Sequence, residues 1–300
     1  MQAVTNEPIG AEDEPDYSRP SSRSSFFRRL KRHKAALSSV IYLGLLIVST
    51  LVIPHVTGYR ADEINLQSAL AGPSLAHLLG TDENGRDELT RLFVGAAGSL
   101  TIGLVAMAIA VLVGTIVGGI AGYLGNVPDN FLMVLTDAFL AVPIFFIVMT
   151  VLMLFGPTLP NIVMVIGLTS WMTVARVVRS EVLRIKQYEF VTAAAALGAS
   201  RMRIFMKHIL PQAFPTIVVA ASLGVAWAIL IETSLSYLGL GVQPPDPSWG
   251  NMLVNAQQYI YSAPLLAVYP GVLILLTVLA FNYLGDVLRD VLDVEMPEAA

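Results

Sequence analysis

The chain has 300 residues, of which 55% are hydrophobic and only 13% are charged, and its mean hydropathy is +0.68. A soluble domain of this length could not bury so much apolar surface, so the composition excludes one and predicts a membrane protein. The net charge of −4 says little about partners. The chain has no cysteine and its four histidines show no ligand spacing, so no disulfide and no metal site is predicted.

Six apolar runs are long enough, or nearly so, to cross the roughly 30 Å of a bilayer core as helices. They cover residues 37–56, 94–122, 131–155, 159–178, 213–239 and 263–287. The runs are continuous and do not alternate as the strands of a membrane barrel would. The sequence therefore predicts an all-α membrane protein with a six-helix transmembrane domain at residues 37–288.

The polar N-terminal region divides into two parts. Residues 1–25 are rich in Pro, Ser and acidic residues, which predicts a disordered tail. Residues 26–36 include the basic stretch "FFRRLKRHK", either a cationic stop at an anionic membrane surface or an amphipathic element that binds a partner. Because this region is too long for a cleaved signal peptide, the first apolar run is predicted to be a signal anchor.

The basic residues predict the orientation in the membrane. Of the 18 Lys and Arg residues, 15 lie before the first run, between 176 and 207, or at Arg289. The other three are Arg60, Arg86 and Arg91, which follow the first run. By the positive-inside rule both termini, the tail 289–300 and the loop 179–212 are cytoplasmic.

Two external segments follow from this orientation. The first, residues 57–93, contains "HLLGTDENGRDELTRLF", in which glycines predict turns and "DELTRLF" predicts a short amphipathic helix. The second, residues 239–262, begins with the proline-rich "GLGVQPPDPSWG". Its Trp249 is predicted to anchor the segment at the membrane interface.

Some residues inside the runs are unusual for lipid-facing helices. Glycines of the run 94–122 have small-xxx-small spacing, which favours close helix packing. Asp137 and Glu232 are ionisable residues within predicted spans, where each costs roughly 2.5–3.5 kcal/mol at a helix centre. They are expected either at helix contacts or in gating and the translocation path.

No enzyme chemistry is visible. The spans hold no nucleophile with a base, no paired acids and no metal cluster, so no catalytic residue is predicted. A GxxxxGK[ST] phosphate loop is absent, and so is the chain of buried acids and histidines expected of a proton-driven pump. Any energy source would have to come from another protein.

The loop 179–212 is cationic and predicted to be helical. Gly198 is well placed to end one helix and Ser200 to cap the next. The spacing of the following apolar residues predicts one apolar face, and Pro211 is expected to stop the helix. These apolar residues are Met202, Phe205, Met206 and Ile209. Such a helix either lies on lipid headgroups or docks in a groove of a soluble partner.

This loop resembles the EAA motif of binding-protein-dependent ABC importer permeases, E-A-A-x-x-x-G followed after nine residues by I-x-L-P. Thr192 replaces the glutamate of the motif and His208 replaces its isoleucine. The matching residues are Ala193, Ala194, Gly198, Leu210 and Pro211.

Four further stretches are similar to the second, or C-type, permease subunit of dipeptide, oligopeptide and nickel importers. They are "HLLGTDENGRDELTRLFVGAAGSL", "ARVVRSEVLRIKQYEFVTAAAALGAS", "ETSLSYLGLGVQPPDPSWGNML" and "FNYLGDVLRDVLD", and the resemblance spans about residues 26–293. It implies the six-transmembrane-helix ABC importer permease fold with a cytoplasmic coupling-helix loop. It implies that the ATPase-coupling residues are Thr192, Ala193, Ala194, Leu197, Gly198, Arg201, Phe205, His208 and Pro211.

The same resemblance implies the partners. They are a homologous second permease, two ABC ATPase subunits or domains that bind ATP and Mg, an external substrate-binding protein and the lipid bilayer of a bacterial inner membrane, with no nucleic acid. This chain would itself hold no cofactor. A secondary transporter or channel not coupled to ATP, and a membrane scaffold without transport, are the alternatives. Which peptide or related small solute is carried is left open.

Overall fold

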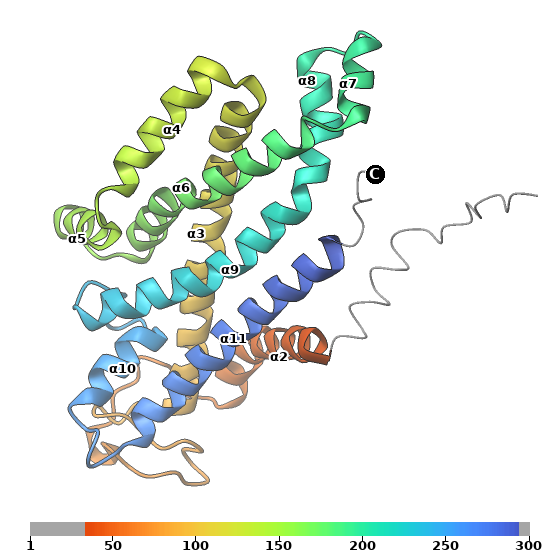
Figure 1. Ribbon diagram of the computed structural model, residues 1–300. Helices are drawn as coiled ribbons and strands as arrows, with labels where there is room; N and C mark the ends of the chain where they lie inside the picture. The colour runs from red at the N-terminus through yellow and green to blue at the C-terminus, as the bar shows by residue number, and fades with distance from the viewer. Residues whose placement is uncertain (1–33, 294–300) are drawn as a thin grey trace, which may run out of the picture.

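The computed structural model describes residues 34–293 of the chain, with side chains to residue 290. The predicted tail 1–25, most of the basic segment 26–36 and the last part of the tail 289–300 lie outside the described residues. In the described part, long helices form a bundle, and two short helices stand out from one end of it (Figure 1). The all-α prediction is confirmed.

Five helices of the described part are long and apolar enough to cross a membrane. The third predicted span, residues 131–155, is instead a bent pair of shorter helices, α4 and α5. The long helices are α2 (Lys34–Val56), α3 (Glu88–Leu124), α6 (Leu159–Ile185), α9 (Leu210–Tyr237) and α11 (Leu265–Asp293). The shorter elements are η1 (Leu66–Ser68), α4 (Asn126–Leu140), α5 (Ile144–Phe155), α7 (Glu189–Ala196), α8 (Arg201–Ile204), η2 (Phe205–Ile209) and α10 (Trp249–Gln257).

The predicted span 131–155 is interrupted. Helix α4 ends at Leu140, α5 begins at Ile144, and the two helices are bent by 75°. Pro143, with φ −58° and ψ 125°, is the N-cap of α5. Proline has no N–H to continue a helix and disfavours helical backbone in the residue before it, so the chain turns here.

Helices α3 and α6 make the most extensive contact in the bundle. Gly114, Gly118 and Gly122 of α3 lie against α6, and a Cβ at Gly114 or Gly122 would be 2.8 Å from a backbone carbonyl oxygen of α6. The predicted small-xxx-small packing is confirmed, because only glycine lets the two backbones approach this closely.

The stretch "DELTRLF" is not a separate helix. Asp87 is the N-cap of α3, and its carboxylate accepts a hydrogen bond from the backbone N–H of Thr90 at 2.8 Å. Helix α3 then continues without a break from Glu88 to Leu124, so the predicted amphipathic helix is its first part.

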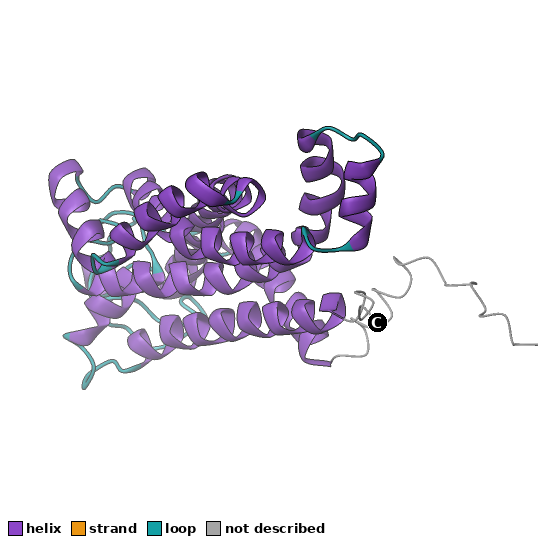
Figure 2. Cartoon of the chain, turned by 45° about the horizontal axis from the view of Figure 1, so that its top comes forward, coloured by secondary structure: helices purple, strands orange, loops and turns teal. Residues whose placement is uncertain are grey.

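Two groups of connections lie at opposite ends of the bundle. The segments 57–87 and 238–264, with α10, lie together at one end, which we call the α10 end (Figure 1). Residues 189–209, which comprise α7, α8 and η2, project from the other end as two adjacent helical arms (Figure 2). We call this projection the α7–α8 hairpin.

The α10 end holds a buried ionic cluster of Asp82, Glu83, Arg86 and Arg91. Oδ2 of Asp82 lies 2.6 Å from Nε of Arg86 and 3.2 Å from Nε of Arg91. The second oxygen of Asp82 accepts the backbone N–H of Arg86 at 2.9 Å, and Nη2 of Arg86 also reaches Glu83 at 3.1 Å. These bonds hold the segment before α3 against the start of that helix.

The predicted position of Trp249 at the membrane interface is wrong. Its side chain is fully buried, and its Nε1–H donates to the carbonyl oxygen of Leu92 at 3.1 Å. Its backbone N–H donates to Oγ of Ser99 at 3.2 Å. Because the preceding segment turns α10 back toward α3, Trp249 packs between the two helices instead of facing lipid headgroups.

Candidate functional site

The α7–α8 hairpin is joined to the bundle by α6 on one side and by α9 on the other. Its first arm is α7, and its second arm is α8 with η2, which leads directly into α9. Val191, Ile204 and Ile209 are buried and belong to the large hydrophobic core of the bundle. The hairpin is therefore packed against the bundle at its base.

The turn between the two arms matches the prediction. Gly198 has φ +80°, and its N–H donates to the carbonyl of Ala195 at 3.0 Å, while Ala199 N–H donates to that of Ala194 at 3.1 Å. This pair of bonds is a Schellman motif, which needs a left-handed residue and favours glycine. Ser200 then caps α8 by accepting a hydrogen bond from the N–H of Arg203 at 3.4 Å.

The predicted apolar face of the second arm is wrong. Met202 and Met206 are 71% and 51% exposed, whereas Ile204 and Ile209 are buried. The reason is that residues Phe205–Ile209 form a π-helical turn, in which Leu210 N–H bonds to Phe205 O. This wider turn brings residues five apart onto the same side, and the i, i+4 pattern no longer applies.

Pro211 does not stop the helix as expected. It stands in the first turn of α9, where its missing N–H is tolerated. The π-helical turn before it shifts the hydrogen bonds by one residue. The second arm and α9 therefore form one continuous helical span, Arg201–Tyr237. The second arm of the hairpin is thus joined to α9 without an intervening loop.

The residues of the EAA-like motif are divided between the surface of the hairpin and its inner side. Leu197, at the turn, is 89% exposed, whereas Phe205 is partly buried against the core. The hydroxyl of Thr192 donates to the carbonyl of Glu189 at 2.8 Å, within the same helix. The other exposed residues are Thr192, Ala193, Gly198, Arg201 and Pro211, and the other partly buried ones are Ala194 and His208.

The hairpin also contacts the end of α3, which the sequence did not reveal. Nζ of Lys186 donates to the carbonyl oxygen of Tyr123 at 2.8 Å. The rings of Tyr123 and Phe205 lie 5.5 Å apart, centroid to centroid. These residues are separated by more than 60 positions in the chain, so no periodicity could have paired them.

Asp137 is half exposed and lies in an ion pair with Arg176 of α6, with an N–O distance of 2.5 Å. A second pair joins the same two helices, since Arg179 contacts both carboxylate oxygens of Asp129, at 2.5 and 2.7 Å. Both pairs hold α4 against α6. In the sequence these arginines indicate only the orientation of the chain. The presence of acidic residues and arginines near the ends of two adjacent spans could have predicted the ion pairs.

Glu232 is fully buried near the end of α9 that faces α10. Its Oε1 accepts hydrogen bonds from the hydroxyls of Ser236 and Ser248, each at 2.8 Å. Ser248 is the N-cap of α10. Among the described residues, Oε2 of Glu232 has no hydrogen-bond partner. Glu232 therefore lies at the contact of α9 with α10.

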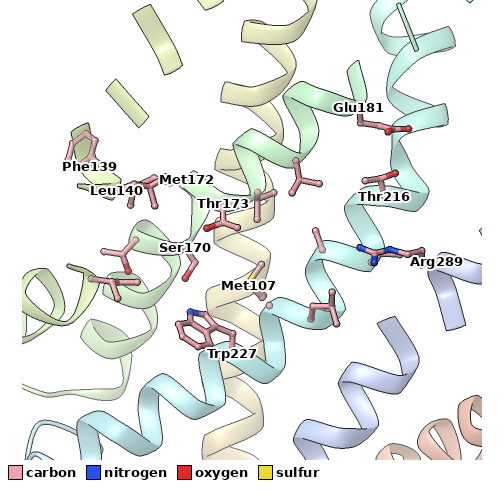
Figure 3. A pocket seen from close by; sticks show the side chains of 18 of the residues that line it. Met107, Phe139, Leu140, Ser170, Met172, Thr173, Glu181, Thr216, Trp227 and Arg289 are labelled. Carbon is pink, nitrogen blue, oxygen red and sulfur yellow. The ribbon is translucent and has the colours of Figure 1, made fainter. Parts of the chain in front are cut away.

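A cavity of about 800 Å³ lies between the spans (Figure 3). Its walls come from α3, α6, α9, α11 and the break between α4 and α5. Most of the lining is apolar, including Met107, Phe139, Met172 and Trp227. Neither Asp137 nor Glu232 lines it.

The charged groups of the cavity lie toward one side. Glu181, Thr216 and Arg289 lie close together in Figure 3, away from Trp227. Glu181 is bonded by Arg184, with an N–O distance of 2.6 Å. Within residues 34–293, no three His, Asp or Glu side chains come together as a group that could hold a metal ion.

Comparison with known families gives two matches. Residues 114–296 match the model of the binding-protein-dependent transport system inner membrane component. Residues 21–73 match the N-terminal transmembrane domain of oligopeptide transport permease C. The first match includes the hairpin and most of the cavity lining.

Individual proteins are also similar. The dipeptide transport system permease protein DppC of Alkalihalophilus pseudofirmus is 39% identical over 98% of this chain and 96% of its own. The glutathione transport system permease protein GsiD of Escherichia coli is 39% identical over 89% of each chain. A chain from an inward-facing structure of the MetNI methionine ABC transporter has a TM-score of 0.56 at 20% identity, over 67% of this chain and 96% of that one.

Proposed function

The chain belongs to the family of binding-protein-dependent transport system inner membrane components, and on that premise we propose that it is one of two permease subunits of an ATP-driven peptide importer. The observation that carries the proposal is the α7–α8 hairpin. It projects from the bundle, presents Leu197 at its turn and continues directly into α9. Such a helical element transmits displacement to the spans without catalysing a reaction.

The hairpin is the docking site of an ABC ATPase subunit. Its exposed apolar groups, Leu197 and Met202, suit insertion into a groove on a soluble partner. In this arrangement two ATPase subunits or domains bind ATP and Mg, and the permease contributes no catalytic group. The exposed residues of the EAA-like motif contact the ATPase, and the partly buried ones position the hairpin.

The cavity is this chain's half of the translocation path. Spans of this chain form its walls, and a homologous second permease would supply the other half of the path. An external binding protein delivers the solute to the α10 end. The chain lies in a bacterial inner membrane with both termini cytoplasmic, in agreement with the concentration of Lys and Arg before the first span and around the hairpin.

The solute is a short peptide. Relatives are named for dipeptide and glutathione transport, and the cavity combines apolar walls with charged groups at one side. A short peptide offers matching features, since its side chains are often apolar while its termini are charged. Both relatives carry small peptides, so di-alanine and glutathione are the probes of choice.

The test is purification of the tagged chain from the membranes of its native cells, with uptake measured in the same cells. We expect a second permease and an ABC ATPase to co-purify, and uptake of labelled di-alanine or glutathione to be lost when the chain is deleted. Uptake that depends on an ion gradient and persists without ATP would instead support a secondary transporter. Wild-type uptake of both probes in the deletion strain would remove the peptide assignment.

The orientation is tested with single cysteines, since the chain has none of its own. Leu75 and Tyr261 are fully exposed at the α10 end, and Ser200 is exposed on the hairpin. We expect a membrane-impermeant thiol reagent applied to intact cells to label cysteine at positions 75 and 261 but not at 200. Labelling at position 200 alone would reverse the orientation.

A further inference from the structure

Phe205 belongs to the motif that we assign to ATPase docking, yet its side chain points into the bundle. It packs against the hydrophobic core, whereas its neighbour Met206 is 51% exposed. An inward aromatic side chain at the base of the hairpin cannot itself dock in a groove of a partner, so its role must be sought within this chain.

The partner of Phe205 is the last part of α3. A Cβ added at Gly119 would lie 2.8 Å from Cζ of Phe205, so the absence of a side chain at Gly119 makes room for the ring. One turn further along α3, the ring of Tyr123 lies 5.5 Å from that of Phe205, at an interplanar angle of 47°. Tilted aromatic pairs at this separation are attractive beyond the area that they bury.

The segment that joins α6 to the hairpin meets α3 at the same place. Lys186, which directly follows α6, donates from Nζ to the carbonyl oxygen of Tyr123 at 2.8 Å and lies 5.7 Å from the centre of its ring. The last carbonyls of a helix lack intrahelical partners and carry partial negative charge, so a lysine is favoured there. Tyr123 is thus held from the second arm of the hairpin and from the segment that leads into the first.

Helix α4 is connected to this junction. The chain passes from Leu124, the last residue of α3, through Gly125 directly into α4. In the first turn of α4, Asp129 is paired with Arg179 of α6 through two bonds of 2.5 and 2.7 Å. The ends of α3, α4 and α6 and the base of the hairpin therefore meet in one group of contacts.

We propose that Phe205 and Lys186 are positioning residues that lock the hairpin to the end of α3, so that α3 and the start of α4 move with the hairpin as one body. This inference rests on the proposed function, because it concerns how displacement by the ATPase reaches the spans. Without this lock, displacement would reach α3 only indirectly, by way of α6 and α9, which are covalently joined to the hairpin and pack against α3. With it, the wall of the cavity formed by α3 and by the α4–α5 break moves as well.

The experiment uses the complete importer with its second permease, ATPases and binding protein. The variants are Phe205→Ala, which removes the ring, and Lys186→Met, which keeps the stem but removes the bond to Tyr123. Phe205→Leu is the conservative variant, and Lys34→Met is the matched control, since Lys34 is exposed at the start of α2, outside the hairpin. ATPase co-purification, ATP hydrolysis stimulated by the loaded binding protein, and uptake of di-alanine are measured for each.

We expect Phe205→Ala and Lys186→Met to retain the ATPase but to lose roughly tenfold in stimulated hydrolysis and uptake, within the usual range of a coupling between two sites. Phe205→Leu should recover much of the loss, and Lys34→Met should behave as the wild type. Normal uptake by both Phe205→Ala and Lys186→Met would overturn the inference. A wild-type complex without an ATPase would instead contradict the proposed function.

A distance measurement separates positioning from simple destabilisation. Spin labels are attached to cysteines at Phe190, on the hairpin but before the EAA-like motif, and Val127, on α4, both of which are exposed. In the wild-type importer the distance should stay the same between the nucleotide-free and the vanadate-trapped state, and in Lys186→Met it should differ between the two. A wild-type distance that changes with nucleotide would show that the hairpin slides on α3, which contradicts a lock.

Discussion

The two ends of the bundle use the same chemistry, carboxylates paired with arginines, in different surroundings. At the α10 end, the side chains of Asp82, Arg86 and Arg91 are 3–7% exposed. Toward the hairpin, those of Arg176 and Asp137 are 52% and 59% exposed. The first group has been removed from solvent on folding, and the second has not.

This difference in burial changes what the ion pairs do. Removing one partner of a buried pair leaves an uncompensated charge and costs about 3–5 kcal/mol, whereas an exposed pair contributes about 0–1 kcal/mol. The α10 end is therefore a rigid unit with few alternative arrangements. The Arg176–Asp137 pair can break and re-form at low cost, as is needed where helices move.

The largest effect is expected for Asp82→Ala. This change leaves Arg86 and Arg91 buried without their shared carboxylate and should lower the free energy of unfolding by about 3–5 kcal/mol. The loss should appear as a lower midpoint when the helical circular dichroism of the purified permease is followed with temperature. Asp62→Ala is the matched control, because Asp62 is paired with Arg60 at the surface, and it should leave the midpoint unchanged. Equal midpoints for the two variants would contradict the comparison.

The next effect concerns Glu232, also at the α10 end. Glu232→Ala removes the acceptor of both Ser236 and Ser248 and should cost about 1–3 kcal/mol of stability. Glu232→Gln keeps one carbonyl oxygen for these hydroxyls and should cost less. The same thermal measurement, together with uptake of di-alanine, distinguishes a structural role of Glu232 at the helix contact from a role in gating. Reduced uptake at unchanged stability would assign Glu232 to gating.

At the hairpin, substitution of Gly198 should reduce ATPase association more than it reduces the stability of the permease. A side chain at its φ of +80° costs roughly 1–2 kcal/mol, but the space around it is open, since an added Cβ meets nothing within 4 Å. We therefore expect Gly198→Leu to insert and pair with the second permease while it loses most ATPase association. Gly198→Ala should be intermediate. Full ATPase association in the Leu variant would remove the docking role from the turn.

The smallest stability effect is expected for Asp137→Ala. Because its pair with Arg176 is half exposed, the loss should be below about 1 kcal/mol. Uptake of di-alanine by this variant shows whether the pair matters for movement. A loss of stability as large as that of Asp82→Ala would mean that burial does not distinguish the two ends of the molecule.

The sequence by itself determined those features that depend on one stretch of chain. The apolar length of each run predicted the helices, because a bilayer core sets how many apolar residues a span needs. The turn at Gly198 was predictable since a left-handed residue at a helix end favours glycine whatever surrounds it. The break between α4 and α5 could also have been predicted, because Pro143 disfavours a continuous helix. It was missed because the run 131–155 is apolar on both sides of this proline.

Only the tertiary structure decided where the polar and aromatic side chains point. Trp249 is buried because α10 folds back against α3, and Phe205 points inward because its ring packs against Gly119 and Tyr123 of α3. Asp137 and Glu232 looked alike in the sequence, yet one is half exposed beside Arg176 and the other is buried beside two serines. Burial and partner depend on which helices pack together, and hydropathy averages carry no information about contacts between residues far apart in the chain.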